Sequence, residues 1–349
     1  MTPKERVMRS LNYQPVDRLA IYDGFWGGFV TNWRKARNPP PGVDIVDYYQ
    51  IDVAICVADE SPFPRMARVM KETPTTKIAR DGYGRVVRTV PGGFFFEVLE
   101  NIPISPRNVD SLPFDPPRAE SRYASFVKHV EAERKRRCPF AKVGGPFLRT
   151  ASVRGETDFL MDIASDPEFA DALASRMADF LIEIGLESLR RGNLYDTGIW
   201  IFDDMAYNDN PMFSPRQFER IFLPCYRRMV AAFKGAGAAK VILHCDGNLA
   251  PILDMLIDAG IDGINPVEPK AHLDLYALKQ KYGNRLAYVG GMCNAHVLPR
   301  GARDQIRAQV DRIKEAARGG GVLIGAHSIG DDVPVENYDY YHGLVMQPF

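Results

Sequence analysis

A histidine and an aspartate follow an apolar segment in the run Val241-Ile242-Leu243-His244-Cys245-Asp246-Gly247-Asn248. Because side chains along a β-strand alternate between its two faces, His244 and Asp246 are predicted to share one face, while Cys245 points into the packing on the other. Imidazole nitrogens and carboxylate oxygens can bind a divalent metal or move protons. The run therefore predicts a strand that ends in a chemically active pair.

Similar polar groups follow other apolar segments of the chain. In sequence order the whole set is Asp23, Asp203 with Asp204, His244 with Asp246, Glu268, Cys293 and His327. Barrel enzymes carry their active sites where the strands end, so these groups are candidates for one common site. The predicted metal ligands are His244, Asp246, Glu268 and His327, a nitrogen and oxygen set that suits zinc, iron or manganese. Each group also has a structural alternative, as a loop cap or a hydrogen-bonded core residue.

About eight apolar segments alternate with helical patterns and would position these groups. The predicted strands lie at residues 18–24, 52–57, 140–145, 197–204, 240–245, 263–268, 286–291 and 322–327. This alternation indicates parallel βα units, and their number favours a single α/β domain over residues 1–349, a closed (β/α)8 TIM barrel. An open, doubly wound sheet remains the alternative. Residues 84–100, with a Pro91-Gly92-Gly93 turn, predict an inserted β-hairpin.

Composition excludes several classes of protein. The chain has 349 residues, 46% of them hydrophobic, and its 44 basic and 44 acidic residues give a formal net charge of zero. The charge balance gives no electrostatic reason to expect nucleic acid or an anionic membrane as a partner. No apolar stretch approaches the roughly 18 residues of a transmembrane helix. The cysteines are scattered without a CxxC pair, which favours a reducing, cytoplasmic location.

Several motifs resemble the uroporphyrinogen decarboxylase superfamily, which also contains cobalamin-dependent methyltransferases. They include Lys4-Glu5-Arg6-Val7, Asp17-Arg18, Gly144-Gly145-Pro146-Phe147, Asp203-Asp204-Met205-Ala206-Tyr207, His244–Gly247 and Asp332-Val333-Pro334, and the resemblance covers nearly the whole chain. It implies a barrel with a deep cleft at its C-terminal rim and assembly as a homodimer. The site residues implied are Asp203, Asp204, Tyr207 and His244 for catalysis, and Asp23, Trp26, Phe147 and Tyr207 for substrate binding.

The two branches of this superfamily differ in their requirements. The decarboxylases have an arginine-rich loop of the form RQAGR, which binds the carboxylates of the tetrapyrrole. The matching residues 23–29 contain no arginine, so decarboxylation of uroporphyrinogen is not expected. The methyltransferases bind zinc through a His-x-Cys strand end and a later cysteine. Here His244 matches the histidine, Asp246 replaces the first cysteine and His327 falls near the second.

The sequence therefore favours a corrinoid-linked methyltransferase that uses zinc or another divalent metal. A protein-bound corrinoid would donate the methyl group, and a small molecule would accept it. Because the predicted metal ligands are nitrogen and oxygen atoms rather than cysteine sulfur, an oxygen, nitrogen or pterin compound fits the role of methyl acceptor as well as a thiol does. One alternative is a cofactor-free decarboxylase that acts on a tetrapyrrole or related acid. The other is a non-catalytic protein that binds a corrinoid or tetrapyrrole.

Overall fold

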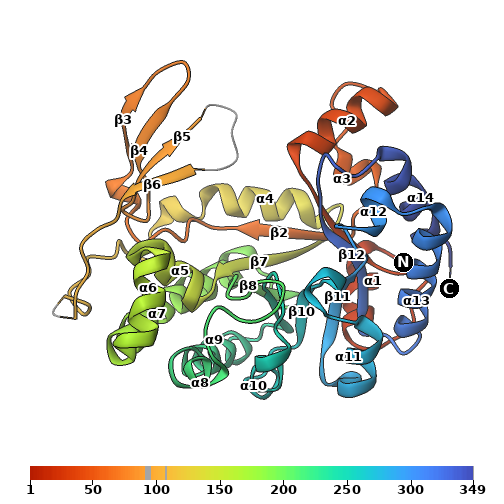
Figure 1. Ribbon diagram of the computed structural model, residues 1–349. Helices are drawn as coiled ribbons and strands as arrows, with labels where there is room; N and C mark the ends of the chain where they lie inside the picture. The colour runs from red at the N-terminus through yellow and green to blue at the C-terminus, as the bar shows by residue number, and fades with distance from the viewer. Residues whose placement is uncertain (91–95, 107, 349) are drawn as a thin grey trace.

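The computed structural model describes residues 1–90, 96–106 and 108–348. Eight parallel strands form one sheet in the order β1-β12-β11-β10-β9-β8-β7-β2 and build a nearly closed barrel with helices around it (Figure 1). The predicted (β/α)8 fold is confirmed. The strands are β1 (Ile21–Phe25), β2 (Val53–Val57), β7 (Cys138–Gly144), β8 (Gly198–Phe202), β9 (Lys240–His244), β10 (Gly263–Val267), β11 (Ala287–Gly291) and β12 (Val322–Ile329).

The surrounding helices follow the helical patterns of the sequence. Side-chain oxygens of Thr2, Asp166, Ser214 and Asp274 accept backbone N–H groups at four helix starts, which satisfies donors that the helices leave open. The helices are α1 (Pro3–Leu11), α2 (Gly27–Arg37), α3 (Ile45–Tyr48), α4 (Ala124–Arg134), α5 (Pro146–Arg154), α6 (Glu156–Ser165), α7 (Pro167–Gly192), α8 (Pro215–Gln217), α9 (Leu223–Gly235), α10 (Leu253–Asp258), α11 (Leu275–Tyr282), α12 (Val297–Arg300), α13 (Arg303–Ala317) and α14 (Val335–Val345).

The barrel interior is a packed apolar core, separate from the layer between strands and helices. One residue in two along each strand points inward, and the interior cluster includes Phe140, Trp200, Ile242, Val289 and Leu323. Val7 and Leu11 of α1 join this cluster and cover its lower end. The inward-facing residues that come next, at the ends of the strands, therefore line the barrel mouth.

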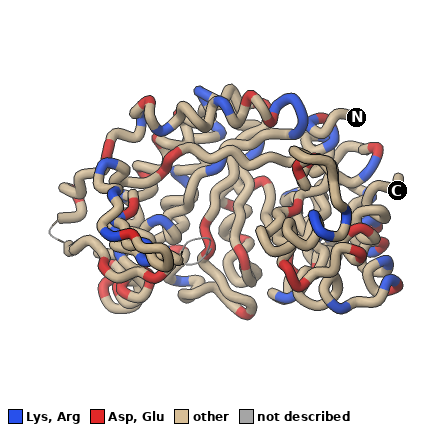
Figure 2. The backbone as a smooth tube through the Cα atoms, turned by 90° about the horizontal axis from the view of Figure 1, so that it is seen from above, with Lys and Arg blue, Asp and Glu red and all other residues tan. Residues whose placement is uncertain are grey.

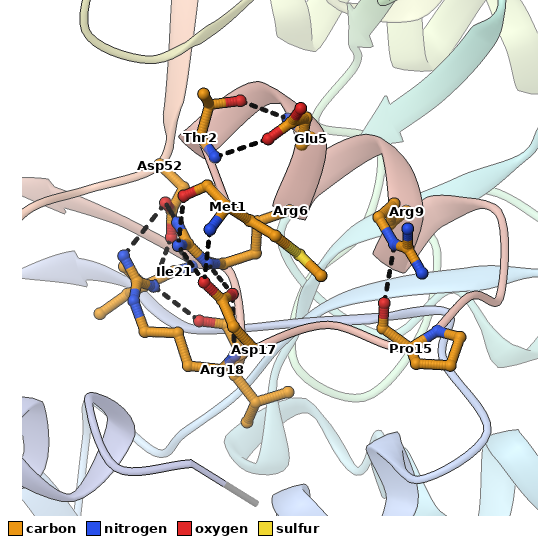
Figure 3. Close-up of polar contacts among 11 residues, drawn as sticks. Met1, Thr2, Glu5, Arg6, Arg9, Pro15, Asp17, Arg18, Ile21 and Asp52 are labelled. Carbon is orange, nitrogen blue, oxygen red and sulfur yellow. Dashed lines mark hydrogen bonds and ion pairs between the residues drawn. The ribbon is translucent and has the colours of Figure 1, made fainter.

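Strands β1 and β2 are the two ends of the sheet order, and buried polar groups connect them near their first residues (Figure 3). The fully buried carboxylate of Asp52 accepts hydrogen bonds from Arg6 at 2.6 Å, Arg18 at 2.7 Å and the Ile21 N–H at 2.9 Å. The Asp52 N–H in turn donates to the Ile21 carbonyl at 2.9 Å. Asp52 thus ties both strands to α1.

The inserted segment is larger than the predicted hairpin. Strands β5 (Val86–Thr89) and β6 (Phe96–Glu100) pair antiparallel as expected, although the expected turn at 91–93 lies outside the described residues. Two further strands, β3 (Arg68–Glu72) and β4 (Lys77–Arg80), complete a four-stranded sheet that projects from the barrel (Figure 1). The sequence prediction missed them because they are short and rich in charged residues, which weakens the strand pattern.

Basic and acidic residues are interspersed around the outline of the molecule when it is viewed from above (Figure 2). This distribution agrees with the formal net charge of zero. Among the described residues, no helix is both long and apolar enough to cross a membrane.

Candidate active site

Three of the four predicted metal ligands lie together at the barrel mouth. One donor atom from each of His244, Asp246 and His327 can be chosen so that all three lie within 4.8 Å of one another. The Asp246 Oδ1 atom is 3.8 Å from His244 Nε2 and 3.6 Å from His327 Nε2. The imidazole centroids are 4.9 Å apart. Ligand atoms that each lie about 2.0–2.2 Å from one zinc ion would be only slightly closer to one another than these donor atoms are, so the observed spacing fits a metal site.

Neighbouring strands fix the orientation of His244. Its Nδ1 atom lies 2.7 Å from Asn265 Oδ1 on β10, and the Asn265 amide nitrogen donates to the Val289 carbonyl at 3.4 Å. Asn265 therefore presents its oxygen to His244, so Nδ1 carries the proton and the Nε2 lone pair is directed toward the cluster. Phe202 stacks on the imidazole at a centroid distance of 4.1 Å.

Unusual backbone conformations place the other two donors. His327 lies within β12 rather than at its end and has a φ of +65°, in the left-handed region. Gly247, directly after Asp246, has a φ of +92°, and a Cβ there would lie 2.7 Å from the carbonyl carbon of Ala206 and the oxygen of Tyr207. Only glycine accommodates this turn without displacing the neighbouring backbone.

The electrostatic environment favours uncharged imidazoles. Burial, followed by the influence of His244 and Lys270, lowers the pKa of His327 to about 3. Burial also lowers the pKa of His244. In contrast, burial and then the charges of Asp204 and Glu268 raise the pKa of Asp246 to about 7. Neutral imidazoles are the form that binds metals, and a cation would relieve the crowding of carboxylates.

One buried carboxylate oxygen at this site lacks a hydrogen-bond partner in the described part of the chain, as expected of an atom that binds a metal ion. Asp246 Oδ1 is buried and has no hydrogen-bond partner among the described residues. A buried carboxylate oxygen without a partner is costly, and a cation would satisfy it. The donor set, with two nitrogens and an oxygen, suits zinc or another first-row divalent ion.

Glu268, the fourth predicted ligand, is bound elsewhere. Its Oε2 accepts the Gly247 N–H at 3.1 Å, and its Oε1, which is buried without a hydrogen-bond partner among the described residues, lies 3.0 Å from the Lys270 ammonium. Asp204 is closer to the cluster, since its Oδ1 is 3.8 Å from His244 Nε2 and accepts the Asp246 N–H at 3.1 Å. The structure therefore places Asp204 beside the three donors and Glu268 beneath the turn that follows Asp246.

Two predicted acids face the helical layer instead of the mouth. Asp203 is fully buried and accepts hydrogen bonds from the Phe147 and Leu148 N–H groups, at 3.2 and 2.6 Å, and from the Tyr226 hydroxyl, at 2.7 Å. It thus holds the start of α5. Asp23 accepts the Ala326 N–H at 2.5 Å and the Tyr338 hydroxyl at 3.0 Å. Neither carboxylate belongs to the three-donor group.

The aromatic residues implied for substrate binding are dispersed. Phe147 is buried and packs against Phe213 and Phe222. Trp26 is 43% exposed at the start of α2, and Tyr207 is 51% exposed. The Tyr207 backbone borders the turn at Gly247, directly after Asp246.

The cysteines at the strand ends are packing residues. Cys245 is fully buried, as predicted, and its sulfur accepts the Met205 N–H at 3.3 Å. Cys293 is also buried, and its sulfur accepts the His296 N–H at 3.4 Å. Neither belongs to the donor cluster.

Sequence reasoning missed Asn265 and Lys142. Asn265 lies in an apolar strand, where a single amide gives little sign of function. Lys142 follows Phe140 at a spacing of two on β7, so the alternation that places Phe140 inside the barrel also predicts an inward lysine.

Comparison with known proteins finds one matching family model and several similar solved structures. The family model described as "Uroporphyrinogen decarboxylase (URO-D)" matches residues 83–346. No curated protein is significantly similar in sequence. A solved structure described as a methyltransferase from Methanosarcina mazei is 19% identical, with a TM-score of 0.68, and the match covers 99% of this chain and 97% of that one. A B12-independent methionine synthase from Shewanella sp. W3-18-1 is 12% identical, with a TM-score of 0.44 and coverage of 95% and 92%.

Proposed function

Because the chain belongs to the uroporphyrinogen decarboxylase family, whose members are enzymes, we propose that it is a metal-dependent methyltransferase with His244, Asp246 and His327 as metal ligands. The observation that carries the proposal is the convergence of these three donors within 4.8 Å at the barrel mouth. The buried, unpartnered Oδ1 atom of Asp246 supports it. Zinc or another first-row divalent ion fits the donor set, and we propose a corrinoid protein as the methyl donor.

The residues of the site would have distinct roles. A bound metal would lower the pKa of an acceptor substrate in an open coordination position. Asn265 would keep His244 in the correct tautomer, and the stacked ring of Phe202 would exclude water from one side of it. Asp204, 3.8 Å from His244 Nε2, would hold the acceptor or take its proton. Tyr207 would contact the substrate from the adjoining turn.

A methyl-transfer assay tests the proposal. The metal-loaded protein is incubated without oxygen with methylcobalamin and, in separate reactions, with a thiol, an amine, an alcohol or a tetrahydropterin. Transfer of the methyl group leaves cob(I)alamin, which is followed by absorbance. We expect one acceptor to give turnover that is lost in His244→Ala. Absence of transfer to every acceptor class would contradict the proposal.

Decarboxylation is the second candidate, because the family model carries that description. The stretch Asp23–Phe29 lacks the cations that would neutralise the carboxylates of uroporphyrinogen. We therefore expect no useful product from uroporphyrinogen III when the reaction is followed by chromatography. Turnover of that substrate would favour the decarboxylase, and specific binding without turnover in either assay would favour a non-catalytic tetrapyrrole-binding protein.

A further inference from the structure

A second buried charged cluster lies beside the proposed metal site. The carboxylate of Glu60 contacts the Lys142 ammonium and the Arg149 guanidinium through the same oxygen, Oε1. Its other oxygen accepts the Gly144 N–H at 2.6 Å. Glu60 is 5% exposed and Lys142 is 8% exposed. The Arg149 side chain is 16% exposed, so the cluster is largely, though not completely, removed from solvent.

This cluster has more positive charge than its carboxylate can neutralise. Lys142 and Arg149 together carry two positive charges when protonated, and Glu60 is the one carboxylate in direct contact with both, while Asp204 acts on Lys142 and Asp203 on Arg149 from farther away. Burial lowers the pKa of Lys142, so an anion bound beside it would favour its charged form. The Nε atom of Arg149 is buried without a hydrogen-bond partner among the described residues. Buried charges and donors are costly unless they are paired, so the cluster is suited to bind an additional anion.

The surplus charge is directed toward the barrel mouth. Phe140 and Lys142 alternate with outward residues on β7, and Phe140 belongs to the barrel interior, so Lys142 is the next inward residue toward the mouth. The Lys142 ammonium lies 5.4 Å from the centre of the Phe202 ring. That ring stacks on His244. Phe202 thus stands between Lys142 and the proposed metal ligands.

The surrounding residues hold Arg149 in place. A Cβ on Gly144 would lie 2.3 Å from Cγ and Nε of Arg149, so the absence of a side chain there lets Arg149 cross the end of β7. The Arg149 guanidinium lies 5.4 Å from the centre of the Tyr83 ring, on the loop that joins β4 and β5 of the inserted sheet. The inserted sheet therefore helps to position this cation.

We propose that Lys142 and Arg149 form an acid-binding subsite that recognises a carboxylate or phosphate group on the substrate. The part of the inference that places the reacting atom at His244, Asp246 and His327 rests on the proposed function. The acid-binding part does not, because it follows from the charge and burial of Lys142, Arg149 and Glu60. The substrate class is then a small acid whose anionic group lies on the Lys142 side of Phe202.

Calorimetric titration of the full chain with benzoate, phenyl phosphate and neutral benzamide tests the proposal. The three probes share an aromatic ring, and ionic strength is held constant. We expect benzoate, phenyl phosphate or both to bind saturably and more tightly than benzamide, and the tighter acid identifies the anionic group. Lys142→Gln should weaken that binding by about tenfold or more, since hydrogen bonds to charged groups are among the stronger ones.

Arg154→Gln is the matched control, because Arg154 lies on the same helix but pairs with Asp162. It should bind the acids as the unmodified protein does. Equal binding of all three probes, no saturable binding of either acid, or unchanged binding in a folded Lys142→Gln variant would overturn the proposal. Zinc titration separates the two sites, because Lys142→Gln should retain the metal, whereas His244→Ala should lose the metal and still bind the acid.

Discussion

The Nδ1 atom of His244 lies 2.7 Å from the side-chain oxygen of Asn265 on the adjacent strand. This contact leaves Nε2 as the only metal-binding nitrogen of His244. Replacing Asn265 by leucine should therefore lower zinc affinity by about 10- to 100-fold, the usual effect of losing a partner that orients a metal ligand. Competition with a chromogenic chelator measures the affinity.

Asn265→Asp is the control for that variant, because it keeps an acceptor for the His244 N–H. It should bind zinc much more tightly than Asn265→Leu. If the leucine variant is folded and binds zinc as well as the unmodified protein, the Asn265 contact has no part in positioning His244.

The structure also distinguishes the predicted ligand Glu268 from the three-donor group. Glu268→Gln should retain most of the zinc affinity, since Glu268 is occupied by the Gly247 N–H and Lys270. His327→Ala should lose most of it. A similar loss in both variants, measured by the same chelator competition, would return Glu268 to the ligand set.

Asp52 is expected to be essential for stability. Asp52→Asn leaves Arg18 buried without a carboxylate and Arg6 with Asp17 as its remaining partner, and it should lower the free energy of unfolding by about 3–5 kcal/mol, measured in urea. Asp17 also binds Arg6, but its side chain is 40% exposed, so Asp17→Asn should cost about 1 kcal/mol or less. Equal losses would show that the connection between β1 and β2 does not depend on Asp52.

Asp23 should make stability depend on pH. Burial raises its pKa to about 6 in the folded protein, so the folded state holds a proton that the unfolded state releases at lower pH. Its contribution to the free energy of unfolding should therefore decrease as pH rises from about 4 to 6, by on the order of 3 kcal/mol in total. Asp23→Asn should lack this decrease and gain stability relative to the unmodified protein across that interval. Parallel pH profiles for the two proteins would refute the assignment.

The barrel could be predicted because about eight apolar segments alternate with helical patterns along the chain, and polar residues follow most of these segments. The alternation of side chains between the two faces of a strand would have separated Asp203 from Asp204. Trp200 points inward, so Asp204 follows on the same face and Asp203 faces the helices. Position at the end of a strand therefore selected too many candidate site residues. The face of the strand on which each residue lies separates those in the barrel mouth from those against the helices.

Other features depend on contacts between distant segments. Glu60 follows β2, yet its partners lie on β7 and α5, and no sequence spacing links them. Asn265 becomes informative only when its oxygen is found against His244. The polar strands β3 and β4 form because they pair with each other and β4 pairs with β5, rather than from their own hydrophobic pattern.

The metal content of the purified protein is the most direct measurement. Protein prepared without chelators and analysed by inductively coupled plasma mass spectrometry should contain about one divalent ion per chain. His244→Ala should lose this ion together with methyl transfer, whereas Cys245→Ser should keep both, because Cys245 lies outside the donor cluster. Metal-free protein that takes up no zinc on titration, or methyl transfer that is unchanged in the presence of a chelator, would contradict a metal site at His244, Asp246 and His327.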